Sequence, residues 1–121
     1  MQRILVALAG FYGFVAVLMA ALTSHLLAGR IDAASLAIVK TGIDIEAWHA
    51  LALLIVGLEV TRLGKWGLRA GALWAFGIFL FCSAVYWRGI MGSSLGGVAP
   101  AGGISLMLGW LMLLWGGVRG F

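Results

Sequence analysis

Long apolar runs without charge alternate with short polar connections along this chain. Residues 4–22, 47–58, 70–87 and 98–118 contain no Asp, Glu, Lys or Arg. Runs of roughly 18 or more apolar residues are typical of transmembrane helices. The pattern predicts an all-α integral membrane four-helix bundle with spans at about 4–27, 43–62, 70–87 and 98–118. No linker separates a second domain, so residues 1–121 form a single transmembrane domain.

The most polar connection, AGRIDAASLAIVKTG over residues 28–42, predicts one additional element. Asp32 suits the N-cap position of a helix, and apolar residues follow it at helical spacing. Gly42 is a typical helix terminator. We therefore expect a short helix lying in the membrane interface between spans one and two, with the second span beginning at Ile43.

Composition supports a membrane protein and excludes nucleic-acid binding. Hydrophobic residues make up 64% of the chain and charged residues 10%, whereas soluble domains carry about 25% charged residues. The net charge of +4 comes from basic residues scattered near the ends of the apolar runs. A nucleic-acid interface would need them clustered on one face. The lipid bilayer is the expected partner instead.

The distribution of Lys and Arg predicts the orientation. Five basic residues fall on the side of the two termini, and three fall on the opposite side: Arg3, Arg62, Lys65, Arg69 and Arg119 against Arg30, Lys40 and Arg88. The positive-inside rule then predicts that both termini are cytoplasmic. On the terminal side, Glu59 and Arg62 are spaced for an ion pair on one helix face.

The stretch IDIEAWHALALL, residues 43–54, brings ionisable groups to the predicted start of the second span. Polar groups at the ends of spans one and three should lie on the same membrane side, which gives a candidate network of His25, Asp44, Glu46, His49, Tyr86 and Arg88. Ionisable residues at membrane depth usually face the bundle and pair with one another. We therefore interpret this set first as a structural network, with Glu46 paired to Arg88 and His49 to a carboxylate or Tyr86.

Ligand binding is the alternative interpretation of the same residues. His25, Glu46 and His49 could form a two-histidine, one-carboxylate set suited to zinc or ferrous iron. His25 and His49 alone could be axial ligands of a haem, and a proton path also stays open. We expect no stoichiometric metal or haem, because the chain offers few further ligands or supporting carboxylates. No serine lies in a hydrolase motif, so no catalytic residue is predicted.

Three stretches resemble a known family. They are LTSHLL with His25, IEAWHALALLIVG with His49, and GIFLFCSAVY followed by VAPAGGISLMLGWLML. Together they are similar to the YgdD/YwdK-like family of small uncharacterised membrane proteins. Glu46 stands where the family pattern has Gln, so a role shared across the family at that position is not ionic.

The resemblance implies four helices in an inner membrane and no established activity. We therefore expect an accessory or structural component of the inner membrane, such as a subunit of a larger membrane complex. The alternative is a metal-, haem- or proton-handling protein that uses His25 and His49.

Overall fold

A computed structural model describes all residues from 1 to 121. It contains four α-helices and no strands: α1 (Gln2–Leu22), α2 (Ala33–Leu58), α3 (Val60–Met91) and α4 (Val98–Arg119). A short π-helix, η1 (Thr23–Leu27), prolongs α1. All four helices are long and apolar enough to cross a membrane. The predicted all-α bundle with four membrane-spanning helices is therefore confirmed.

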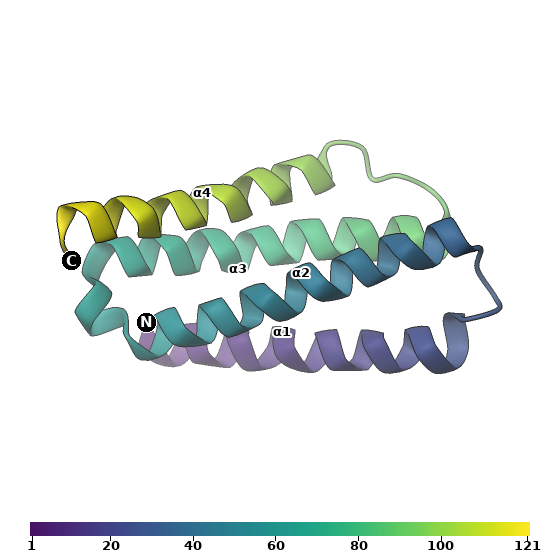
Figure 1. The fold of residues 1–121 in the computed structure, drawn as a ribbon, viewed down its shortest axis with the longest axis horizontal. Helices are drawn as coiled ribbons and strands as arrows, with labels where there is room; N and C mark the ends of the chain where they lie inside the picture. Colours follow the sequence, from purple (N-terminus) through teal and green to yellow (C-terminus); the bar gives the residue numbers. More distant parts are fainter.

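The helices run antiparallel in chain order, and each packs on its neighbour (Figure 1). Both termini and the α2–α3 turn lie at one end of the bundle. The two longer connections, residues 28–32 and 92–97, lie at the other end. Helix α1 packs mainly on α2 and α4 mainly on α3, so α1 and α4 occupy the two flanks.

The predicted interfacial helix between spans one and two is wrong. Helix α2 begins at Ala33 rather than at Ile43, and it runs through Gly42 without a break. Asp32 does cap this helix, because its Oδ1 accepts a hydrogen bond from the Ser35 backbone N–H at 2.7 Å. The first turns pack on the end of α3 instead of lying among headgroups. Val39 is fully buried there, and a Cβ on Gly89 would overlap it.

The turn between α2 and α3 is tighter than the basic, glycine-rich sequence suggests. Only Glu59 separates the two helices, and the backbone leaves helical geometry once more at Gly64, with φ 55° and ψ −143°. Helix α3 therefore begins well before the predicted Ala70. The expected ion pair is present, with Arg62 Nη1 3.1 Å from Glu59 Oε2. Arg62 is largely exposed and Glu59 is about half exposed, so the pair stabilises the fold little.

Small residues allow α3 and α4 to approach closely. A Cβ on Gly102 would overlap the Phe81 backbone, and a Cβ on Gly109 would overlap the Trp74 indole. The Ser105 hydroxyl donates a hydrogen bond to the Leu73 carbonyl at 2.7 Å. Small and hydroxyl-bearing residues at such contacts are typical of helix packing in membranes. This packing presents Trp74 and the centre of α4 to α2.

Candidate functional site

Glu46 and His49 lie on the buried face of α2, in the middle of the helix. Their side chains are 2% and 6% exposed, and the spacing of buried residues at 42, 46, 49 and 53 follows one helix face. Because α2 begins at Ala33, His49 lies about 24 Å along the helix at 1.5 Å per residue. The polar groups are therefore deep in the bundle, whereas the sequence had suggested a shallow zone at the helix start.

Glu46 is joined to α3 by Tyr86, whose hydroxyl donates a hydrogen bond to Glu46 Oε2. Gly42 makes room for this contact, since a Cβ there would lie 2.8 Å from Tyr86 Cε1. The Cys82 thiol donates a weak hydrogen bond to the Gly42 carbonyl at 3.6 Å. Glu46 is thus held by Tyr86, and the expected ion pair with Arg88 is absent. Arg88 is exposed near the end of α3.

His49 uses both ring nitrogens within the protein. Nδ1 lies 2.7 Å from the Ile45 carbonyl, and Nε2 lies 3.0 Å from Trp110 Nε1. An indole N–H can only donate, so Nε2 accepts and Nδ1 carries the proton that it donates to Ile45. The geometry therefore assigns a neutral imidazole. Its partner is Trp110, not the carboxylate or Tyr86 that we expected.

Two tryptophans enclose the imidazole. The His49 ring lies edge-on to Trp74 and Trp110, with ring centroids 6.1 Å and 5.9 Å away. The two indoles are 4.6 Å apart, and Trp74 Nε1 donates to the Leu106 carbonyl at 3.2 Å. Both indole N–H groups therefore have an acceptor, in the buried Trp74 and in Trp110, which is 49% exposed on the outer side of the cluster. This cluster ties α2, α3 and α4 together.

The structure does not bring His25, Glu46 and His49 together as a three-residue metal-binding cluster. His25 is exposed in η1, beside the connection to α2, whereas both nitrogens of His49 are already bonded in the core. No three His, Cys, Asp or Glu side chains gather in an arrangement that could hold a metal ion. Asp44 is exposed on a different face of α2 from Glu46, where it lines a small polar pocket.

Sequence analysis missed Trp74 and Trp110 as partners in this cluster. Both lie in the middle of a span, whereas tryptophans that anchor a helix at the membrane surface lie near its ends. Trp66 and Trp115 illustrate the second kind, since Lys65, Arg69 and Arg119 lie over their rings. A tryptophan in the middle of a span needs an acceptor for its N–H. This requirement could have indicated from the sequence that Trp74 and Trp110 have polar partners.

The fold and these contacts define a four-helix membrane protein whose buried polar side chains are bonded mainly to one another and to the backbone. A family model described as "Protein of unknown function (DUF423)" matches residues 19–103. The chain belongs to this family, which confirms the resemblance seen in the sequence.

Three relatives match almost the whole chain. The UPF0382 inner membrane protein YgdD of Escherichia coli strain K12 is 31% identical over 122 residues, covering 98% of this chain and 92% of that protein. A UPF0382 membrane protein of Haemophilus influenzae is 30% identical over 116 residues, covering 95% and 91%. The UPF0382 membrane protein YwdK of Bacillus subtilis is 29% identical over 121 residues, covering 98% of each. No solved structure matches.

Proposed function

We propose that the protein is a non-enzymatic accessory or structural component of the cell inner membrane and acts as a subunit of a larger membrane complex. The observation that carries this proposal is the hydrogen bond from Trp110 to His49, which occupies the last free nitrogen of the imidazole. Glu46 is likewise held by Tyr86. Side chains engaged in this way hold helices together and leave no nucleophile or base aimed at a substrate. The inner-membrane location is supported by the name of the relative YgdD.

The short connections support a function within the bilayer. Only residues 28–32, Glu59 and residues 92–97 lie between the helices. Many large side chains on the outer surfaces are apolar, including Phe14, Val17 and Leu114, each more than 60% exposed. A partner protein would therefore contact the helices in the plane of the membrane. We propose that both termini face the cytoplasm, which is supported by the five basic residues at the end of the bundle that holds the termini.

The test is purification of the tagged protein in mild detergent, followed by three measurements. Absorption and elemental analysis are expected to show no Soret band and no stoichiometric zinc, iron or copper. Native electrophoresis with quantitative mass spectrometry is expected to show the protein in a larger species, with another membrane protein at fixed stoichiometry. A Soret band, or near one equivalent of metal lost on replacing His25 or His49, would instead establish the metal- or haem-binding alternative.

Proton handling is a second candidate, and one observation favours it. The carboxyl group of Glu46 is 2% exposed, and no cation pairs with it. Buried acids inside membranes often take part in proton relays. Purified protein in liposomes with a trapped pH dye tests this function. Proton flux that disappears in Glu46→Gln would favour it over the accessory role, whereas flux equal to that of empty liposomes would exclude it.

A further inference from the structure

A polar pocket lies between the end of the first transmembrane segment and the early turns of α2. It has a volume of about 220 Å³ and is lined by Ala20, Thr23, Ser24, Lys40, Ile43 and Asp44. Lys40 and Asp44 are one helical turn apart, a spacing that permits an ion pair. They form none, because the structure contains a single ion pair, Arg62–Glu59. Both charges therefore face the pocket region without a charged partner.

Thr23, which also lines this pocket, has a hydroxyl without a hydrogen-bond partner. Its side chain is 3% exposed, and Oγ1 is a buried side-chain polar atom without a hydrogen-bond partner. A threonine hydroxyl in a helix commonly bonds the carbonyl four residues earlier, as Thr41 does with Ala37 at 3.1 Å. Thr23 instead begins the π-helical turn η1, and such turns occur frequently at functional sites.

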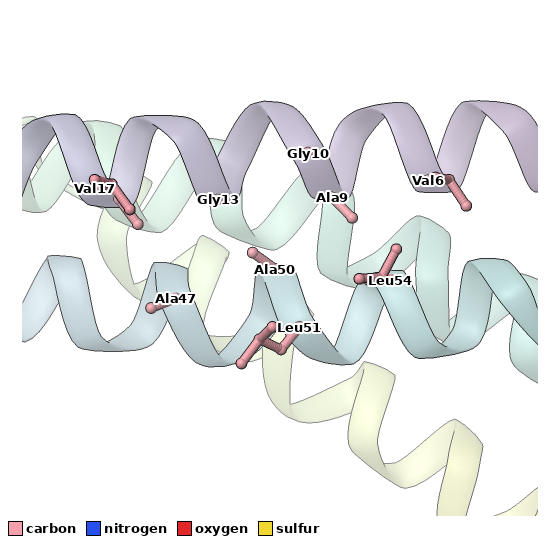
Figure 2. A pocket seen from close by; sticks show the side chains of 10 residues that line it. Val6, Ala9, Gly10, Gly13, Val17, Ala47, Ala50, Leu51 and Leu54 are labelled. Carbon is pink, nitrogen blue, oxygen red and sulfur yellow. The ribbon is translucent and has the colours of Figure 1, made fainter.

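An apolar groove continues from the polar pocket along the same pair of helices. It has a volume of about 450 Å³, and Figure 2 shows α1 and α2 running side by side along it. Its α1 side is formed largely by small residues, including Ala9, Gly10 and Gly13. A Cβ at Gly10 or Gly13 would meet nothing within 4 Å. The groove is therefore open along the lipid-facing side of the seam.

The spacing of the lining residues shows that the pocket and the groove share one face. On α1 and η1 the lining residues recur every three or four positions from Val6 to Ser24. On α2 they recur at the same spacing from Lys40 to Leu54. Positions at this spacing lie on one side of a helix. The α1–α2 seam therefore has a charged, hydroxyl-lined end and an apolar remainder, which we call the seam site.

We propose that the seam site binds one phospholipid whose headgroup carries a phosphate and a primary ammonium group. The phosphate accepts hydrogen bonds from Lys40 and from the Ser24 hydroxyl. The Thr23 hydroxyl is buried, and it joins them once its side chain turns Oγ1 into the pocket. The ammonium donates to the Asp44 carboxylate. Lys40 and Asp44 are four residues apart, about 6 Å along the helix at 1.5 Å per residue, which their flexible side chains can adjust to the two-carbon arm between phosphate and ammonium.

The apolar groove has the right length for an acyl chain. From Val17 to Val6, α1 rises about 16 Å at 1.5 Å per residue. One leaflet of the bilayer contributes about 15 Å of hydrocarbon. A helix from a partner or a second copy could also cover the small residues, but an apolar helix would leave Lys40, Asp44 and Thr23 without partners. The opposite charges at one end of the groove therefore favour the lipid.

Native mass spectrometry of the full-length protein in detergent tests the proposal with added phosphatidylethanolamine and, separately, phosphatidylglycerol. Gly13→Leu fills the groove, Lys40→Gln removes the phosphate contact, and Asp44→Asn removes the ammonium contact. Gly117→Leu and Lys65→Gln are matched controls, because Gly117 is equally open on α4 and Lys65 lies at the other end of the bundle. Circular dichroism checks that all variants keep the wild-type helix content.

We expect one bound phosphatidylethanolamine, and affinity about tenfold lower in Gly13→Leu and in Lys40→Gln, as loss of one strong contact predicts. Asp44→Asn should lose the preference over phosphatidylglycerol, and neither control should change binding. Soluble phosphoethanolamine should not compete at equal concentration, since it lacks the acyl chain.

Equal lipid binding by wild type and Gly13→Leu would overturn the proposed site. Equal binding of the two lipids by wild type would overturn the headgroup assignment. A dimer that Gly13→Leu dissociates without lipid release would assign the seam to a second copy.

Discussion

Trp110 of α4 donates its indole N–H to Nε2 of His49 of α2 across 3.0 Å. The two residues are 61 positions apart in the chain, and each of their helices also packs extensively on α3. The contact holds the imidazole in the tautomer that donates to the Ile45 carbonyl. One hydrogen bond thus closes α4 onto α2 and determines the protonated nitrogen of His49.

Replacing Trp110 by Phe should destabilise the protein by about 1–2 kcal/mol, because a buried acceptor loses its donor. The aromatic ring is kept, so most packing on Trp74 is retained. Thermal unfolding in detergent measures the loss. Nitrogen-15 chemical shifts of the His49 ring provide a second readout, because Nε2 should lose the signature of a hydrogen-bonded acceptor. Trp115→Phe, near the terminal end of α4, is the control and should leave both measurements unchanged.

The Tyr86–Glu46 pair gives a second prediction. Tyr86→Phe should cost about 1–3 kcal/mol, because Glu46 then has no hydrogen-bond partner in the core. Glu46→Gln should cost less than about 1 kcal/mol, since an amide oxygen can still accept from the Tyr86 hydroxyl. Unfolding of the two variants and the double mutant gives the coupling energy. Equal and large losses for both single variants would show that the charge of Glu46 matters.

Hydrophobic pattern was sufficient to predict four helices, and the end of α4 was predicted to within a residue. It could not distinguish the roles of Gly42 and Gly64. Gly42 was expected to end a helix, but it is continuous helix because Tyr86 packs against it. Gly64 does leave helical geometry, at a φ of 55° that favours glycine. The contact at Gly42 is with residues of α3 that are remote in sequence, so the local pattern could not reveal it.

The polar network was likewise predicted only in part from the sequence. The positions of Glu46, His49 and Tyr86 at the ends of apolar runs predicted that they share one zone, and the structure places Tyr86 against Glu46, deeper in the bundle than expected. The individual hydrogen-bond partners could not be predicted from the sequence. Trp110 reaches His49 only when Gly109 allows the Trp74 indole to lie against α4. Arg88 was expected to pair with Glu46, but it is exposed near the end of α3.

Gly42 should be intolerant of even one additional methyl group. A Cβ would lie 2.8 Å from Tyr86 Cε1 and 3.0 Å from Val85 Cγ1, so α2 and α3 would have to separate. Overpacking of this kind costs about 1–3 kcal/mol. We expect Gly42→Ala to lower thermal stability in detergent, whereas Gly117→Ala, which meets nothing within 4 Å, should be neutral or slightly stabilising. Equal stability of the two variants would contradict the close α2–α3 contact.

The N-cap of α2 should weaken in acid. Hydrogen bonds from the Ser35 backbone N–H and from its side chain hold the pKa of the exposed Asp32 below its ordinary value. A depressed pKa in the folded state means that the carboxylate stabilises the helix above the unfolded pKa, and that this contribution is lost as pH falls through the folded pKa. Hydrogen exchange at Ser35 should therefore speed up, relative to intrinsic exchange, between about pH 5 and pH 2. Asp32→Asn keeps a cap that does not titrate, so its protection should stay constant over that range.

Membrane orientation can be tested at the two ends of the bundle. The termini and the α2–α3 turn lie together, and residues 92–97 lie at the opposite end (Figure 1). In a Cys82→Ser background, which keeps a donor for the Gly42 carbonyl, we would introduce Lys65→Cys and Ser94→Cys separately. Both positions are exposed. A membrane-impermeant maleimide then reports which end each cysteine occupies.

The Lys/Arg bias predicts that Ser94→Cys is labelled in right-side-out vesicles and that Lys65→Cys is labelled only in inverted vesicles. The bias is five basic residues against three, so the orienting force is modest, but the antiparallel fold requires the two labels to respond oppositely. Labelling of Lys65→Cys from outside would reverse the orientation while leaving the fold intact. Labelling of both positions from one side would contradict the four-span arrangement itself, because α3 crosses the membrane once between Lys65 and Ser94.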